Sequence, residues 1–214
     1  MSESEAKTPA RGQLFVVSAP SGAGKTSLLK ALIARNPALT FSVSYTTRAP
    51  RFGEEGGRDY HFIDAARFEA MQAADAFLES ARVFGNGYGT AAADVERERA
   101  GGRDVVLEID WQGARQVRRR RPETVSIFIL PPSRESLRAR LTGRGTDSES
   151  IIDRRMAAAA TEMAHWDEYD YVVVNDEFER ALADLAAIVD GKGAATERSR
   201  PELKDLASKL LAST

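Results

Sequence analysis

The hydrophobic pattern of the chain alternates between short apolar runs and longer stretches in which apolar residues recur every three or four positions. Such runs are typical of strands buried on both faces, and the periodic stretches are typical of helices that cover a sheet. The pattern predicts strands at residues 14–17, 41–44, 77–84, 105–110, 125–130 and 171–175. It predicts helices at residues 25–35, 64–71, 91–100, 114–121, 133–141, 148–163, 178–189 and 201–211. The alternation predicts an α/β protein with a parallel sheet and helices on both faces.

Two segments interrupt this alternation. Residues 41–92 have short strands and few helices, so we expect a small inserted domain there. Residues 135–167 are rich in arginine and predict a second insert, a helical flap. The core then comprises residues 13–40, 93–134 and 168–190. Residues 1–12 and 191–214 are predicted to be tails, the second with a helix.

Composition narrows the class of protein. A chain of 214 residues, 43% of them hydrophobic, can build one core with small inserts. Its net charge of −2 argues against a broad nucleic-acid surface. With no cysteine and two histidines, disulfides and thiolate or histidine metal sites are not expected. No run reaches membrane-span length and residues 1–12 lack a signal-peptide pattern, so we expect a cytoplasmic protein, monomeric or homo-oligomeric.

A phosphate-binding loop is predicted between the first strand and the first helix, where the chain reads Ser18-Ala19-Pro20-Ser21-Gly22-Ala23-Gly24-Lys25-Thr26. Gly22 and Gly24 allow the backbone to turn its N–H groups toward phosphate oxygens. The helix that opens at Lys25 adds its positive dipole end, and the lysine can reach the β- and γ-phosphates. The Thr26 hydroxyl suits Mg²⁺. Ala19 stands where the motif has its first glycine, so the match is imperfect there.

A second group of residues predicts a base and phosphate site in the small insert. Glu79 lies in an apolar run, and a carboxylate there needs partners. Guanine offers two adjacent donors that a carboxylate can accept side by side, whereas adenine lacks this pair. Hydroxyls of Ser44 and Thr90 could donate to guanine O6. The alternative is a strand glutamate that faces water.

Arginines and carboxylates elsewhere are further candidates. Arg48 and Arg51, with Tyr60 nearby, suit a phosphate, although a solvated loop has the same composition. In the flap, three arginines can neutralise a transferring phosphoryl group or remain solvated; they are Arg140, Arg144 and Arg155. Glu108 and Asp110 end a strand where ligands of parallel sheets bind and can hold hydrated Mg²⁺. Asp110 can also cap the helix that follows.

Taken together, these strings resemble the guanylate kinase family. The matching strings lie at residues 18–26, 41–51, 57–62, 77–79, 85–90, 107–113, 129–133, 141–146 and 173–176. They follow the family's order and span residues 13–190. The resemblance implies the P-loop nucleoside monophosphate kinase fold, with a GMP-binding insert and a helical lid. It implies transfer of the γ-phosphoryl group of Mg-ATP to GMP or dGMP.

The resemblance also implies roles for individual residues. The implied catalytic residues are Lys25, Arg48, Arg140, Arg144 and Arg155. The implied ATP-binding residues are Ser18, Ala19, Pro20, Ser21, Gly22, Ala23, Gly24, Lys25, Thr26, Ser27 and Asn175. The implied GMP-binding residues are Ser44, Arg48, Arg51, Tyr60, Glu79, Tyr88, Thr90 and Asp110. Mg²⁺ would be held by Thr26, with Asp110 through water. Tyr45 and Glu108 stand where the family often has other residues.

Two other functions stay open at this point. One is a nucleoside monophosphate or sugar-phosphate kinase with another acceptor, against which Glu79 and Thr90 argue. The other is a non-catalytic guanylate-kinase-like module that binds phosphorylated peptides. Such modules usually have a degraded phosphate-binding loop, whereas Lys25 and Thr26 are intact here.

Overall fold

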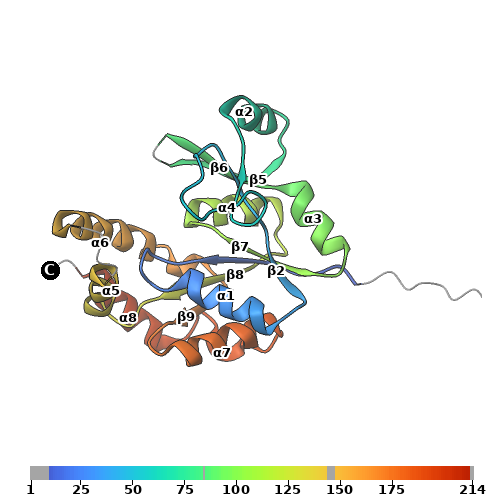
Figure 1. Ribbon diagram of the computed structural model, residues 1–214. Coiled ribbons are helices and arrows are strands. Elements are labelled where there is room, and N and C mark those ends of the chain that lie inside the picture. Colours follow the sequence, from blue (N-terminus) through green and yellow to red (C-terminus); the bar gives the residue numbers. More distant parts are fainter. Residues whose placement is uncertain (1–9, 84, 144–147, 213–214) are drawn as a thin grey trace, which may run out of the picture. The chain divides into compact units, whose positions relative to one another are not determined.

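The computed structural model describes residues 10–83, 85–143 and 148–212 (Figure 1). Its strands are β1 (Leu14–Ser18), β2 (Leu39–Phe41), β3 (Tyr45–Thr46), β4 (His61–Phe62), β5 (Phe77–Val83), β6 (Asn86–Ala91), β7 (Asp104–Glu108), β8 (Val125–Leu130) and β9 (Tyr171–Val174). Its α-helices are α1 (Lys25–Arg35), α2 (Ala65–Ala73), α3 (Ala92–Ala100), α4 (Trp111–Arg120), α5 (Arg134–Thr142), α6 (Glu149–Met163), α7 (Phe178–Val189) and α8 (Pro201–Leu211). Two 3₁₀ turns complete the set, η1 (Trp166–Glu168) and η2 (Gly193–Thr196).

The strands form two sheets. The first has the order β2-β7-β1-β8-β9, and its pairs β2/β7 and β8/β9 are parallel. The second has the order β4-β3-β6-β5, in which β6 runs antiparallel to both of its neighbours. Strand β1 is buried along its whole length, and β7, β8 and β9 are buried except at their ends, which is the signature of a sheet covered on both faces. The predicted α/β class with a parallel sheet core is confirmed.

The chain forms two compact units, each of which is described by itself. Unit 1 comprises residues 1–15, 38–107 and 116–124, and unit 2 comprises residues 16–37, 108–115 and 125–214. In unit 1, α2 begins directly after Asp64, because the Asp64 side chain caps it by accepting a hydrogen bond from the Arg67 N–H at 2.7 Å. Phe68 of this helix packs with Phe77 in a small core, against which Tyr45 also packs.

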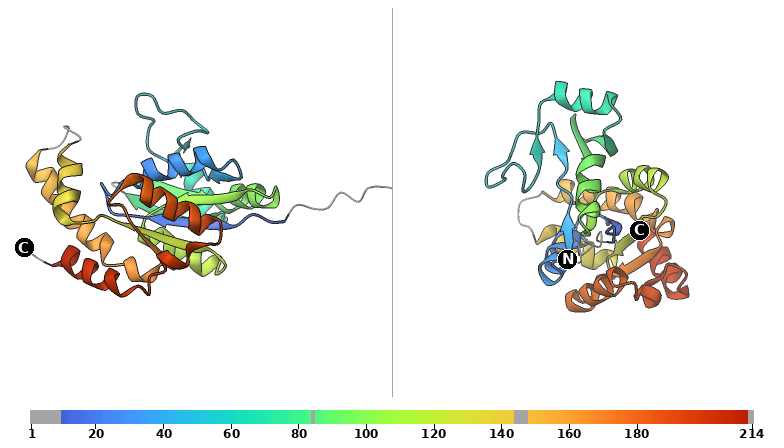
Figure 2. Two further views of the ribbon diagram at one scale, coloured as in Figure 1. Left: turned by 90° about the horizontal axis from the view of Figure 1, so that it is seen from below. Right: turned by 90° about the vertical axis from the view of Figure 1, so that its right-hand side faces the viewer.

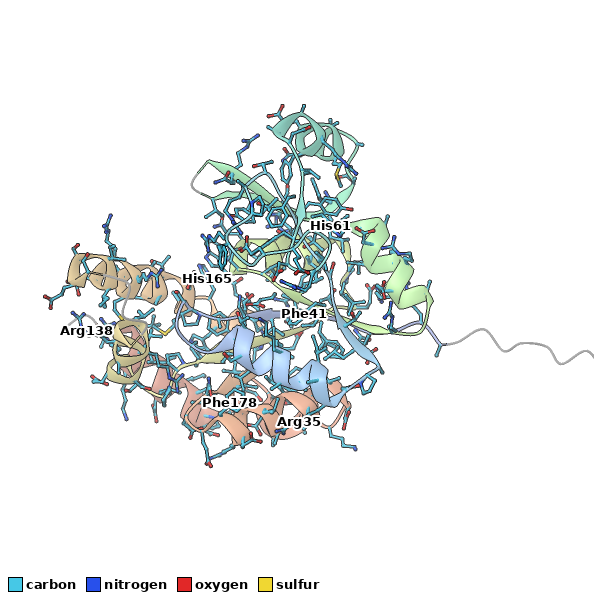
Figure 3. All side chains as sticks on the ribbon, viewed as in Figure 1. Arg35, Phe41, His61, Arg138, His165 and Phe178 are labelled. Atoms are coloured by element: carbon cyan, nitrogen blue, oxygen red, sulfur yellow. The ribbon has the colours of Figure 1, made fainter. Side chains whose placement is uncertain are left out.

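Helices pack in pairs within unit 2. Helix α1 packs against α7, α5 against α6, and α6 against α8. The neighbours α1 and α7 can be followed in Figures 1 and 2. The α5–α6 pair carries an ion pair between Arg138 and Asp153, with Nη1 and Oδ1 2.7 Å apart; Arg138 is labelled in Figure 3. The residues predicted as a flap thus include two helices that contact each other directly.

Most predicted elements are present, but several of their boundaries differ from the structure. The strand expected at 41–44 is wrong: β2 ends at Phe41 and β3 begins at Tyr45, because the chain leaves one sheet for the other between them. Strand β7 ends at Glu108, and α4 begins three residues before the expected helix, because Asp110 caps it by accepting from the Gly113 N–H at 2.9 Å. Strand β6, Asn86–Ala91, is not among the predicted strands.

Candidate active site

The loop between β1 and α1 has the backbone geometry that the sequence predicts for a phosphate-binding loop. Gly22 and Gly24 have φ angles of 90° and 92°, in the left-handed region that only glycine adopts without strain. A Cβ at Gly24 would lie 2.5 Å from Nδ2 of Asn175. That amide donates to the Ala23 carbonyl at 2.7 Å, so the residue after β9 holds the loop in place.

The phosphate-binding loop lines a cavity of about 340 Å³ in unit 2, together with the carboxylates of Asp110 and Glu162. Lys25 and Thr26 point to the same carboxylate: Thr26 Oγ1 donates to Glu108 Oε1 at 2.5 Å, and Lys25 Nζ lies 3.9 Å from that oxygen. The hydroxyl and carboxylate oxygens gathered here are the ligand type that Mg²⁺ prefers, so the residues fit a metal–nucleotide complex.

Glu162 is a cavity residue that the sequence analysis did not identify. It belongs to α6, and its Oε2 accepts a hydrogen bond from the Ser21 N–H at 3.1 Å. Burial raises the pKa of the Glu162 carboxyl, although the Ser21 N–H and the Lys25 charge oppose that rise. Burial likewise lowers the pKa of Lys25, against the attraction of Glu108 and its neighbours. The cavity therefore holds desolvated charges of both signs.

A cluster of side chains fixes the end of α6 near Glu162. His165, labelled in Figure 3, stacks on Trp111 with ring centroids 3.7 Å apart. Its Nδ1 lies 2.7 Å from Glu168 Oε1, and Arg115 Nε donates to the other oxygen of that carboxylate at 2.7 Å. This cluster ties the turn that follows α6 to the beginning of α4.

The predicted flap arginines have different surroundings. Arg140 on α5 reaches the phosphate-binding loop, where Nη2 donates to the Asn175 carbonyl at 2.8 Å and Nη1 to the Ala23 carbonyl at 3.4 Å. Arg155 is half-buried on α6. Arg144 lies outside the described residues. The structure thus brings Arg140 to the loop.

Unit 1 brings together the three predicted base-binding residues. Glu79 on β5 is only 6% exposed and lies opposite Thr90 on β6. Thr90 Oγ1 donates to Glu79 Oε1 at 2.6 Å, and the Ser44 hydroxyl lies 3.4 Å from that of Thr90. A buried carboxylate with hydroxyls beside it can accept hydrogen bonds from a base edge.

The predicted acceptor-phosphate residues also lie in unit 1. The guanidinium carbon of Arg48 lies 5.5 Å from the ring centroid of Tyr60, whose ring contacts that of Tyr88 at a centroid distance of 6.0 Å. Arg51 has an exposed side chain, and its backbone N–H donates to Glu54 at 2.8 Å. Glu54 also holds Arg48, a partner that sequence reasoning did not find.

The part of the chain that the structure describes contains neither a cluster of metal-ligating side chains nor a membrane-spanning helix. Among residues 10–83, 85–143 and 148–212, no group of three or more His, Cys, Asp or Glu side chains could hold a metal ion. In the same ranges, no helix has the length and apolar character needed to cross a bilayer.

The fold and the loop together define a P-loop nucleotide-binding protein. The guanylate kinase family model matches residues 11–192, and the chain belongs to the guanylate kinase family. It is 58% identical over 200 residues to the guanylate kinase of Alkalilimnicola ehrlichii, covering 94% of this chain and 98% of the relative. It is also 58% identical over 201 residues to that of Methylococcus capsulatus, with the same shares. The crystal structure of guanylate kinase from Anaplasma phagocytophilum matches with a TM-score of 0.67 and 32% identity, covering 96% of this chain and 99% of that one.

Proposed function

We propose that this protein transfers the γ-phosphoryl group of Mg-ATP to GMP or dGMP, giving ADP and the guanine nucleoside diphosphate. The observation that carries the choice of acceptor is the buried Glu79 carboxylate, which accepts a hydrogen bond from Thr90 at 2.6 Å. Family membership and the intact Lys25 and Thr26 support catalysis over binding alone. The cytoplasm is the proposed site of action.

Acceptor binding is assigned to the insert at residues 41–92. Glu79 accepts the two adjacent donors of guanine, with Thr90 and Ser44 beside it. Arg48, Arg51, Tyr60 and Tyr88 take the acceptor phosphate. A guanidinium and a phenol both donate hydrogen bonds, so these side chains suit the oxygens of a phosphate.

Donor binding is assigned to residues 18–27 with Asn175, and the lid to residues 135–167. The Lys25 ammonium group offsets negative charge on the β- and γ-phosphates. Thr26 would hold Mg²⁺, with Asp110 acting through water. Bound Mg²⁺ would neutralise charge on the phosphate oxygens. Arg140, Arg144 and Arg155 stabilise the transferring group, while Arg48 holds its acceptor in line. Closure of lid and insert excludes water, which would otherwise hydrolyse ATP.

The test is ADP release from the full chain with Mg-ATP and a panel of GMP, dGMP, AMP and UMP. We expect rapid release with GMP and dGMP and little with the others. Glu79→Ala should lower kcat/KM for GMP by up to roughly 10⁴-fold and leave ATP binding intact, because the base edge loses its hydrogen-bonding partner. Equal use of AMP, or near-normal GMP use by Glu79→Ala, would contradict the assignment. Nucleotide binding without ADP release would favour a non-catalytic module.

A further inference from the structure

Glu54 is a carboxylate that holds the loop of the acceptor-phosphate residues together. Both of its oxygens accept from Arg48 Nη2, at 2.9 and 3.0 Å, and Oε2 also accepts from the Arg51 N–H at 2.8 Å. The side chains of Arg48 and Glu54 are 14% and 20% exposed. This is a partly buried, charge-assisted contact, which is stronger than an ordinary surface ion pair.

The surroundings of Arg48 leave its guanidinium little freedom to rotate. Nη1 donates to the Ala49 carbonyl at 2.7 Å, and the guanidinium carbon lies 5.5 Å from the Tyr60 ring centroid and 5.9 Å from that of Phe62. A guanidinium presents five N–H groups. Glu54 engages Nη2, the Ala49 carbonyl engages Nη1, and Tyr88 is a further side-chain hydrogen-bond partner, so the guanidinium is held in a defined orientation among the acceptor-phosphate residues.

Glu54 is anchored independently of Arg48. The Glu54 N–H donates to the Arg51 carbonyl at 3.1 Å, while the Glu54 carboxylate accepts from the Arg51 N–H, so the two residues close a turn on each other. A carboxylate that merely fills the place of a phosphate would have to break this turn when the phosphate arrives. A carboxylate that only orients Arg48 need not move.

The charge of Glu54 indicates that it does not bind the phosphate itself. The neighbouring Arg48 and the Arg51 N–H lower the pKa of Glu54, so the carboxyl is anionic when GMP binds. An anion repels a phosphate dianion at contact distance, whereas it stabilises and orients an arginine placed between them.

We propose that Glu54 is the positioning residue of the acceptor-phosphate site: it holds the Arg48 guanidinium in the orientation that binds the phosphate of GMP. This inference rests on the proposed function. It adds a residue that acts on the substrate only through Arg48. Loss of the carboxylate charge should therefore weaken acceptor binding while the donor site is unaffected.

The test uses Glu54→Gln in the full chain, because glutamine keeps the side-chain shape and removes the charge. Calorimetry with GMP alone should give a Kd raised about tenfold, as expected for loss of a charge-assisted contact. Steady-state kinetics should give a KM for GMP raised by a similar factor and a KM for ATP within about twofold of the wild type. Glu54→Asp, which retains the charge, should recover part of the loss.

Glu55→Gln is the matched control. Glu55 is the next residue, its side chain is 69% exposed, and it pairs with Arg58 rather than with Arg48, so GMP affinity should not change. A double-mutant cycle separates positioning from general damage to the loop: in an Arg48→Ala background, Glu54→Gln should have little further effect on the Kd for GMP.

Three outcomes would overturn the inference. One is an unchanged Kd for GMP in Glu54→Gln. Another is a lower Kd, which would identify Glu54 as a competitor of the phosphate. The last is a full additional loss in the Arg48→Ala background. Calorimetry measures acceptor binding without turnover. A wild type that binds GMP and does not phosphorylate it would therefore overturn the proposed function and leave this test readable.

Discussion

Glu162 accepts a hydrogen bond from the backbone N–H of Ser21, with Oε2 3.1 Å from the nitrogen. The two residues are 141 positions apart in sequence, one on α6 and the other in the phosphate-binding loop. The N–H groups of such a loop are the donors that nucleotide phosphates use. A phosphate at this position therefore competes with Glu162 for the same donor and is repelled by its charge.

Replacing Glu162 by glutamine should tighten nucleotide binding. The change keeps the length of the side chain and removes one negative charge that lies near the phosphate position. At an effective dielectric constant of 20, two charges 4 Å apart interact by about 4 kcal/mol before screening by salt, so we expect the Kd for ADP to fall on the order of tenfold. Calorimetry at fixed pH and ionic strength measures this directly.

Glu149→Gln provides the control for that substitution. Glu149 lies on the same helix, and its side chain is 87% exposed. Its charge is screened by water, and the Kd for ADP should stay within about twofold of the wild type. A weaker affinity in Glu162→Gln would mean that Glu162 supports the loop rather than competing with the phosphate.

Nucleotide affinity should also depend on pH through the two shifted groups of this cavity. The pKa of Glu162 is raised, so affinity should rise as the pH falls through it, because protonation removes the competing charge. The pKa of Lys25 is lowered, so affinity should fall as the pH rises through it, because the ammonium loses its charge. In Glu162→Gln the part of the acid change that is due to Glu162 should disappear, and the alkaline change should persist.

Binding curves of the wild type and of Glu162→Gln for ADP, measured across pH, check this prediction. The nucleotide's own protonation is the same in each experiment, so the difference between the two curves isolates Glu162. Parallel curves at acid pH would contradict the role assigned to its carboxyl.

The Thr90–Glu79 contact should matter for stability as well as for acceptor binding. Thr90→Val preserves the shape and leaves a carboxylate that is 6% exposed without this hydroxyl donor. Loss of the partner should cost about 1–3 kcal/mol of unfolding free energy. Chemical denaturation measures the stability, and kcat/KM for GMP should fall in parallel.

Thr124→Val is a suitable comparison for this stability measurement. Thr124 is 5% exposed, and its Oγ1 has no hydrogen-bond partner among the described residues. Replacing that hydroxyl by a methyl group should cost less than about 0.5 kcal/mol or stabilise the protein, since no bond is lost. Equal losses in the two variants would mean that the Thr90 effect is not due to its bond with Glu79.

The elements that sequence alone predicts well are those with strong local signals. Both bounds of α7 and α8 match, because each has a periodic apolar face and α8 has proline at its first position. The error at residues 41–44 arises from pairing: Thr40 lies opposite Val105 in one sheet, and Tyr45 lies opposite Gly89 in the other. No local pattern marks where a chain changes sheets.

In the candidate site, too, some residues could be predicted from local sequence and others could not. Glu79, Thr90 and Ser44 could be predicted together because a carboxylate in an apolar strand demands partners. Glu162 and Glu54 could not, because a glutamate on a helix or in a polar loop is ordinarily solvated. What gives each a role is its partner in space, the Ser21 N–H for one and the Arg48 guanidinium for the other.

The C-terminal helix α8 should be part of the stable core of unit 2. Leu203, Ala207 and Leu210 are at most 4% exposed, and Arg134 Nη1 donates to the Leu210 carbonyl at 3.0 Å. Leu203→Ala should therefore cost about 2–5 kcal/mol, the usual range for a cavity in a packed core, measured by denaturant unfolding. Lys204→Ala, at an exposed position of the same turn, should change stability by less than about 0.5 kcal/mol. If Leu203→Ala costs as little as its neighbour, α8 unfolds separately and its contacts do not support the nucleotide-binding unit.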